Sequence, residues 1–174
     1  MRIVLASVVA AVVLFFFGFI WWGVLMPSVR PANVITDTEF VNAMSASMPE
    51  SGVYFYPDYG EHPEEPIEPW AMLYFNKTAP AMGPMMGMGF GHMLLSALLA
   101  SCGLSYLAEK SFSRRFAIVC FLGLFVALWA DVGNMIWWRH PIGWTVFHFA
   151  YDVLSWDIAA LIIAGIVKPD AEAV

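Results

Sequence analysis

The chain has 174 residues, of which 60% are hydrophobic and only 13% are charged. A soluble domain usually carries about 25% charged residues, so this composition excludes an ordinary water-soluble domain and predicts that lipid surrounds much of the chain. The net charge of -6, with only eight Lys and Arg and no basic patch, argues against nucleic acid as a partner.

Four apolar runs are each long enough to cross the hydrocarbon core of a bilayer, which takes about 20 helical residues. Lipid offers no partner to an unpaired backbone amide, so each run is expected to be an α-helix. The predicted spans are 3–26, 84–107, 116–138 and 143–167. The first span is longer than the apolar core of a signal peptide and lacks a small-residue cleavage site, which predicts a retained anchor.

The basic residues predict the orientation of these spans. The short loop 109–115 carries three of the eight Lys and Arg, and such loops stay on the cytoplasmic side. Tryptophan favours the membrane–water boundary, and five tryptophans mark the opposite side: Trp21, Trp22, Trp137, Trp138 and Trp144. The sequence therefore predicts a multi-pass protein of the bacterial inner (cytoplasmic) membrane with both termini cytoplasmic and segment 27–83 periplasmic or extracellular.

Segment 27–83 is acidic and too short to be a large domain. Thr36 and Glu39 form a capping-box pattern, which predicts a short amphipathic helix that ends before Pro49. Residues 52–56 and 71–75 are rich in aromatic side chains and predict a two-stranded hairpin. Such a hairpin is not stable alone, so we expect the segment to form a small α+β cap on the ends of the helices.

An acidic loop, 57–69, separates the two predicted strands. A solvated loop is the favoured interpretation, because the spacing of the acids fits no calcium-binding loop. Cation binding is the alternative. The side chains concerned are Asp58, Glu61, Glu64, Glu65 and Glu68, with His62 beside them.

Small residues at four-residue spacing let transmembrane helices approach closely. Three spans carry such a stripe: Gly83, Gly87 and Gly91 in the second; Gly123, Ala127 and Asp131 in the third; Ala6, Ala10, Leu14 and Gly18 in the first. The spacing predicts close packing, either within the chain or against another protein.

Polar side chains inside the membrane are costly and are functional candidates by default. We expect five of them to share one layer in the external half of the membrane: His92, Asp131, Asn134, His148 and Asp152. Asp157 follows Asp152 by five positions, so it should point away from this layer and either need a partner of its own or be protonated.

Three interpretations of this layer stay open. It can be a hydrogen-bonded network that fixes helix register. It can be a metal or cofactor site, with zinc or copper held by His92, Asp131, His148 and Asp152, or a haem ligated by His92 and His148. It can also be a proton or ion path, and because four helices are few for a transporter, such a path would need an oligomer. Five methionines cluster beside His92: Met82, Met85, Met86, Met88 and Met93. Methionine is common filler in apolar helices, which is the favoured interpretation. Copper binding is the alternative, since thioethers suit Cu(I).

Three segments resemble a family of small bacterial four-helix integral membrane proteins: the opening 1–4 and Trp21-Trp22 anchor, residues 49–54, and the last span with Asp152 and Asp157. The resemblance implies the layout and brings no activity with it. Enzyme motifs are absent from the sequence, and Cys102 and Cys120 fall in apolar runs, where they should pack as small hydrophobes.

The sequence thus predicts an all-α membrane protein, with four transmembrane helices in a bundle and the small cap between helices 1 and 2. The expected division is a first helix at 1–26, a cap at 27–83 and a three-helix region at 84–174. The favoured function is a non-catalytic accessory, assembly or stabilising subunit, partnered by the lipid bilayer and by other membrane-protein subunits or further copies of itself. The metal or haem protein and the conducting oligomer are the alternatives.

Overall fold

The computed structural model describes residues 1–57 and 70–168. It divides into two compact units, Met1–Ala32 with Met82–Val174, and Asn33–Ala81. The acidic loop predicted to be solvated lies almost entirely outside the described residues. Each unit is described by itself.

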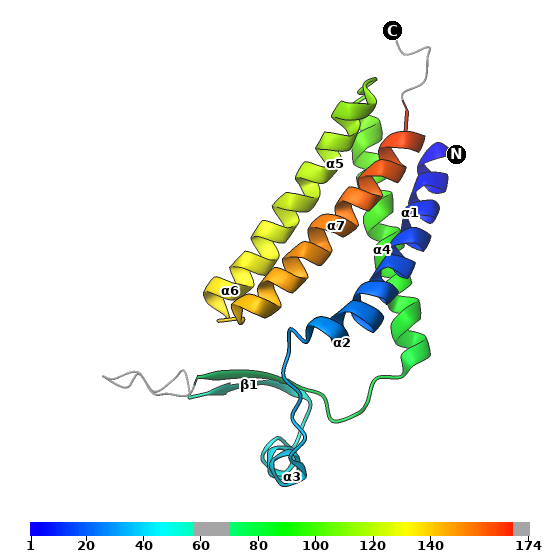
Figure 1. Ribbon diagram of the computed structural model, residues 1–174. Coiled ribbons are helices and arrows are strands. Elements are labelled where there is room, and N and C mark those ends of the chain that lie inside the picture. Colours follow the sequence, from blue (N-terminus) through cyan, green and yellow to red (C-terminus); the bar gives the residue numbers. More distant parts are fainter. Residues whose placement is uncertain (58–69, 169–174) are drawn as a thin grey trace. The chain divides into compact units, whose positions relative to one another are not determined.

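The first unit contains four helical spans that are long and apolar enough to cross a membrane. The helix α1 (Arg2–Ile20) continues through a π-helical turn, η1 (Trp21–Leu25), into α2 (Met26–Val29), and α4 (Met82–Tyr106) forms the second span. The third span joins α5 (Phe112–Ala127), a second π-helical turn, η2 (Leu128–Val132), and α6 (Gly133–Trp137). The fourth is α7 (Ile142–Ile166). The prediction of four helices long and apolar enough to cross a membrane is confirmed within the described residues, and Figure 1 shows how they are arranged.

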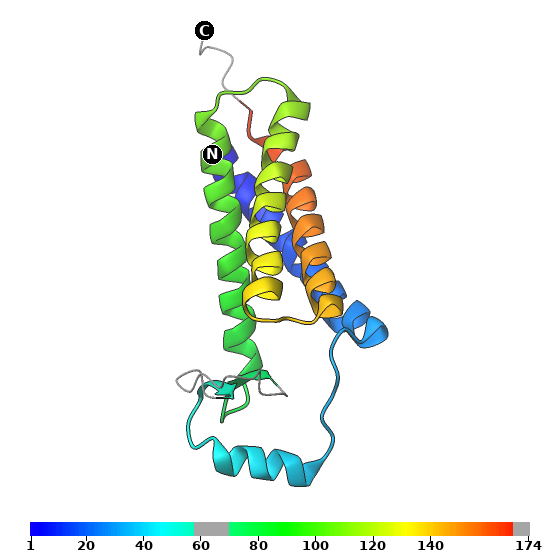
Figure 2. The same cartoon turned by 90° about the vertical axis from the view of Figure 1, so that its left-hand side faces the viewer.

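The contacts between these helices are uneven. α1 packs against both α4 and α7, and α5 packs along α7, whereas α4 touches α5 and α7 only sparsely (Figures 1 and 2). The core is built from small residues such as Ala6, Ala10 and Ala160, which are fully buried. Large apolar side chains such as Phe121 and Trp129 point outward instead. This distribution suits a protein whose solvent is lipid, because close helix contact in a membrane depends on small side chains.

The three small-residue stripes have different uses. In α1, Ala6, Ala10 and Gly18 are buried against neighbouring helices. In the third span Gly123 is pressed against the Trp156 side chain of α7. At Gly83, Gly87 and Gly91 of α4 an added Cβ would meet nothing within 4 Å among the described residues. Two stripes therefore pack within the chain, and that of α4 faces outward.

The second unit contains α3 (Thr38–Ser47) and an antiparallel pair of strands, β1 (Gly52–Tyr56) and β2 (Ala71–Phe75), paired from Gly52 with Phe75 to Tyr56 with Ala71. The strands match the prediction. The helix cap does not, because Asp37 caps α3 in place of Thr36. Its carboxylate accepts hydrogen bonds from the backbone amides of Glu39 (2.9 Å) and Phe40 (3.2 Å). A carboxylate at this position also interacts favourably with the helix dipole.

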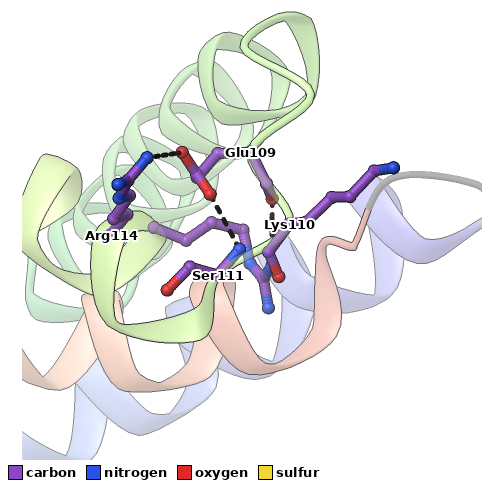
Figure 3. A network of polar contacts seen from close by, with 5 residues as sticks. Glu109, Lys110, Ser111 and Arg114 are labelled. Atoms are coloured by element: carbon purple, nitrogen blue, oxygen red, sulfur yellow. Dashed lines mark hydrogen bonds and ion pairs between the residues drawn. The ribbon is translucent and has the colours of Figure 1, made fainter. Parts of the chain in front are cut away.

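The connection between α4 and α5 is held by polar contacts (Figure 3). The Glu109 carboxylate accepts a hydrogen bond from the Ser111 backbone amide at 2.8 Å and pairs with Arg114 at 3.5 Å. These contacts, with the Ser111 amide first among them, lower the pKa of Glu109 below its usual value of 4.5. The neighbouring Arg115 is buried and donates to three backbone carbonyls, at Ala164, Glu109 and Lys110. It thereby ties the end of α7 to this connection.

Candidate functional site

Three residues of the predicted polar layer meet in the structure. Asp131 lies on the π-helical turn η2 and is only 8% exposed. Its carboxyl group interacts with the carboxyl of Asp152 and with the imidazole of His148, both on α7. His140, in the connection before α7, lies within electrostatic range of Asp131 and His148. We call Asp131, His148 and Asp152 the polar trio.

The polar trio contains buried atoms without a protein partner. Asp131 Oδ2 and His148 Nε2 have no hydrogen bond among the described residues, and the same holds for Ser155 Oγ one turn further along α7. Buried polar atoms are nearly always paired, so each exception calls for an explanation such as a bound water, an ion or a functional role. The trio is therefore not a closed network of side-chain hydrogen bonds.

Aromatic rings fix the position of His148. Its imidazole centroid lies 4.8 Å from the ring of Trp22 and 4.3 Å from that of Trp144. Trp22 belongs to η1 and Asp131 belongs to η2. Both described π-helical turns, on two different spans, therefore lie near His148. Single π-helical turns often accompany functional sites. Neither turn carries a proline or another signal that would have revealed it in the sequence.

His92 belongs to a different part of the layer. It is exposed on α4 and lines a pocket of about 260 Å³ together with Asp152 and Ser155 of α7. Asp131 and His148 do not line this pocket. The structure therefore brings His92 towards Asp152 and leaves His148 in its aromatic surroundings.

Within residues 1–57 and 70–168, no three His, Cys, Asp or Glu side chains are arranged to hold a metal ion. The metal set of His92, Asp131, His148 and Asp152, and the haem ligated by His92 and His148, stay predictions from the sequence.

The remaining polar candidates are dispersed. Asn134 is half-buried on α6. Asp157 interacts with the Cys120 thiol of α5, which supplies the separate partner that its position called for. Most of the methionine cluster is exposed, and only Met93 reaches a half-buried position.

Comparisons of the chain with protein-family models, with curated proteins and with solved structures found no significant match. The class follows from the helices alone. Four apolar spans, as judged by their length and composition, define a multi-pass membrane protein.

Proposed function

We propose that the protein is a non-catalytic accessory subunit that assembles with, or stabilises, a larger membrane complex through α4. The observation that supports this is the outward stripe of Gly83, Gly87 and Gly91, where an added Cβ would meet open space. A smooth stripe at four-residue spacing is the surface on which a second transmembrane helix can pack closely. The other two stripes of the chain are already used internally.

The proposed occupant of this surface is a transmembrane helix of another subunit. α4 is the least buried of the four spans, with 11% of its most apolar window buried inside the protein. The backbone along the stripe has no side chains to hold a partner away, so van der Waals packing and weak Cα–H···O contacts can operate along two turns.

Substitution of Gly87 tests this role. In mild detergent the wild-type chain should co-purify with a partner membrane protein, and Gly87→Leu should lose most of that partner, because the leucine blocks close approach. Gly103→Leu is the matched control. Gly103 is also an open glycine of α4, but sixteen residues from Gly87 it points about 160° away at 3.6 residues per turn. A wild-type chain that purifies as a lone monomer, or as a homodimer sensitive to Gly87→Leu, would contradict the accessory role.

We also propose that the four helices form a bundle in the bacterial inner membrane. In this arrangement α3 and the β1–β2 hairpin form an extracytoplasmic cap. An even number of spans puts both termini on one side of the membrane. The basic loop 109–115 favours the cytoplasm for that side, and the five tryptophans at the opposite helix ends favour an external interface there.

The polar trio supports a second candidate function, the conduction of protons or ions by an oligomer. Neighbouring carboxyl and imidazole groups can pass protons, and two atoms of the trio have no hydrogen-bond partner in the part of the chain that the structure describes. In liposomes loaded with a pH-sensitive dye, Asp131→Asn should lower proton flux at least tenfold while the helix content stays unchanged. Asp157→Asn is the control, because Asp157 faces Cys120 and not the trio. Equal flux in wild type and Asp131→Asn would exclude this candidate.

A further inference from the structure

The sparse contact between α4 and α7 leaves two adjoining pockets beside α1. The first, of about 260 Å³, is the one that His92, Asp152 and Ser155 line. The second, of about 400 Å³, is bounded by apolar side chains of α1 and α4, among them Phe15, Phe19 and Met86. Met93 and Tyr151 line both pockets, so the two are neighbours. Together they fall in the range of about 300–1,000 Å³ that is typical of small-molecule sites.

The first pocket is polar on two opposite walls. His92 follows the first residue of α4 by ten positions, and Asp152 follows the first residue of α7 by ten positions. Each is therefore about 15 Å along its helix from the end at which that helix begins. The hydroxyls of Ser96 and Ser155 add further hydrogen-bonding groups, and Ser155 Oγ has no partner within residues 1–57 and 70–168. Trp156 adds an aromatic residue to the lining.

These features select the chemistry of a ligand. Among the described residues no Lys or Arg lines either pocket, so an anionic head group would meet no permanently charged cation and would lie beside the Asp152 carboxyl. A head group buried this deep among transmembrane helices should be uncharged and hydrogen-bonded, because a charge away from water is costly. Two polar side chains on facing walls suit a flat ring with one oxygen at each end. The apolar second pocket suits an attached hydrocarbon chain.

We infer that these pockets bind one lipid-soluble quinone, with its ring between His92 and Asp152 and its chain along Phe15 and Phe19. The ring contacts Trp156, and its two oxygens accept hydrogen bonds from the His92 imidazole and from the Ser155 hydroxyl. The site is formed inside one chain and does not use the Gly87 stripe, so it is independent of the accessory role.

The test measures binding of decylubiquinone to the full-length chain in mild detergent, by quenching of tryptophan fluorescence. The wild type should bind saturably, and Trp156→Phe should lose much of the quenching. His92→Ala and Ser155→Ala should each weaken binding by about tenfold, which is the scale of one hydrogen bond to a buried polar partner. Ser96→Leu should abolish binding, because the larger leucine side chain would occupy the first pocket.

Ser105→Leu is the matched control for Ser96→Leu, since Ser105 is an exposed serine of the same helix outside both pockets. It should bind like the wild type. Thermal unfolding of each variant separates loss of the site from loss of the fold. Unchanged binding by correctly folded Ser96→Leu would overturn the inference. So would absence of saturable binding to the wild type, or binding of dodecylamine in place of decylubiquinone, which would assign a cationic head group.

Discussion

Replacement of Arg115 by alanine should lower the free energy of unfolding by about 3 kcal/mol or more, since hydrogen bonds to charged groups contribute about 1.5–3 kcal/mol each. Arg115 is only 3% exposed. Its Nε donates to the Ala164 carbonyl at 3.0 Å, and its Nη1 donates to the carbonyls of Glu109 and Lys110. The Ala164 carbonyl is one of the last four of α7, which have no partner within their own helix. The substitution thus frees the end of α7 and the connection before α5 together.

The neighbouring arginine provides the control for this prediction. The Arg114 side chain is 77% exposed and pairs with Glu109 at 3.5 Å. An exposed pair of this kind contributes about 0–1 kcal/mol, so Arg114→Ala should leave stability almost unchanged. Arg115→Lys should fall between the two, because a lysine keeps the charge and cannot reproduce the planar set of donors. SDS titration of the purified protein measures all three variants, and equal stability of Arg114→Ala and Arg115→Ala would refute the capping role.

Arg115 also shows where inference from the sequence stops. The apolar runs predicted four spans because lipid makes length and hydrophobicity decisive. The same pattern placed Arg115 in a loop before the third span, as one basic residue among three. Its acceptors are backbone carbonyls, one of them 49 residues further along the chain. Every residue has a backbone carbonyl, so a sequence pattern cannot show which of them accepts a hydrogen bond.

The candidate site was predicted in part for a similar reason. Helical spacing put Asp152 and His148 on one face, and the stripe of the third span turned Asp131 inward, where it is buried. Spacing along single helices does not give the distance between helices. The loose contact of α4 with α7 places His92 on a pocket with Asp152, apart from His148. The two π-helical turns also shift which residues share a face of the helix, and no residue type in the sequence predicts such a turn.

Gly123 lies at the contact between α5 and α7, and its substitution should cause the second large loss of stability. A Cβ at position 123 would overlap Cβ and Cγ of Trp156. The position of the Trp156 Cβ is fixed by the backbone of α7, so rotation of the side chain cannot relieve the overlap and one helix backbone must shift. Overpacking usually costs about 1–3 kcal/mol, occasionally more, and Gly123→Ala should reach the upper end of that range in SDS titration. It should do so even though alanine favours a helix over glycine by about 1 kcal/mol.

The same substitution elsewhere should have the opposite sign. At Gly103 an added Cβ meets nothing within 4 Å among the described residues, so Gly103→Ala should stabilise the protein by up to about 1 kcal/mol. If the loss at position 123 arises from the Trp156 contact, the double variant Gly123→Ala/Trp156→Ala should be less destabilised than the sum of its single changes. Strict additivity would refute that origin. Because Trp156 also forms a wall of the first pocket, a shift of α7 in Gly123→Ala should weaken decylubiquinone binding, which connects helix packing to the proposed ligand site.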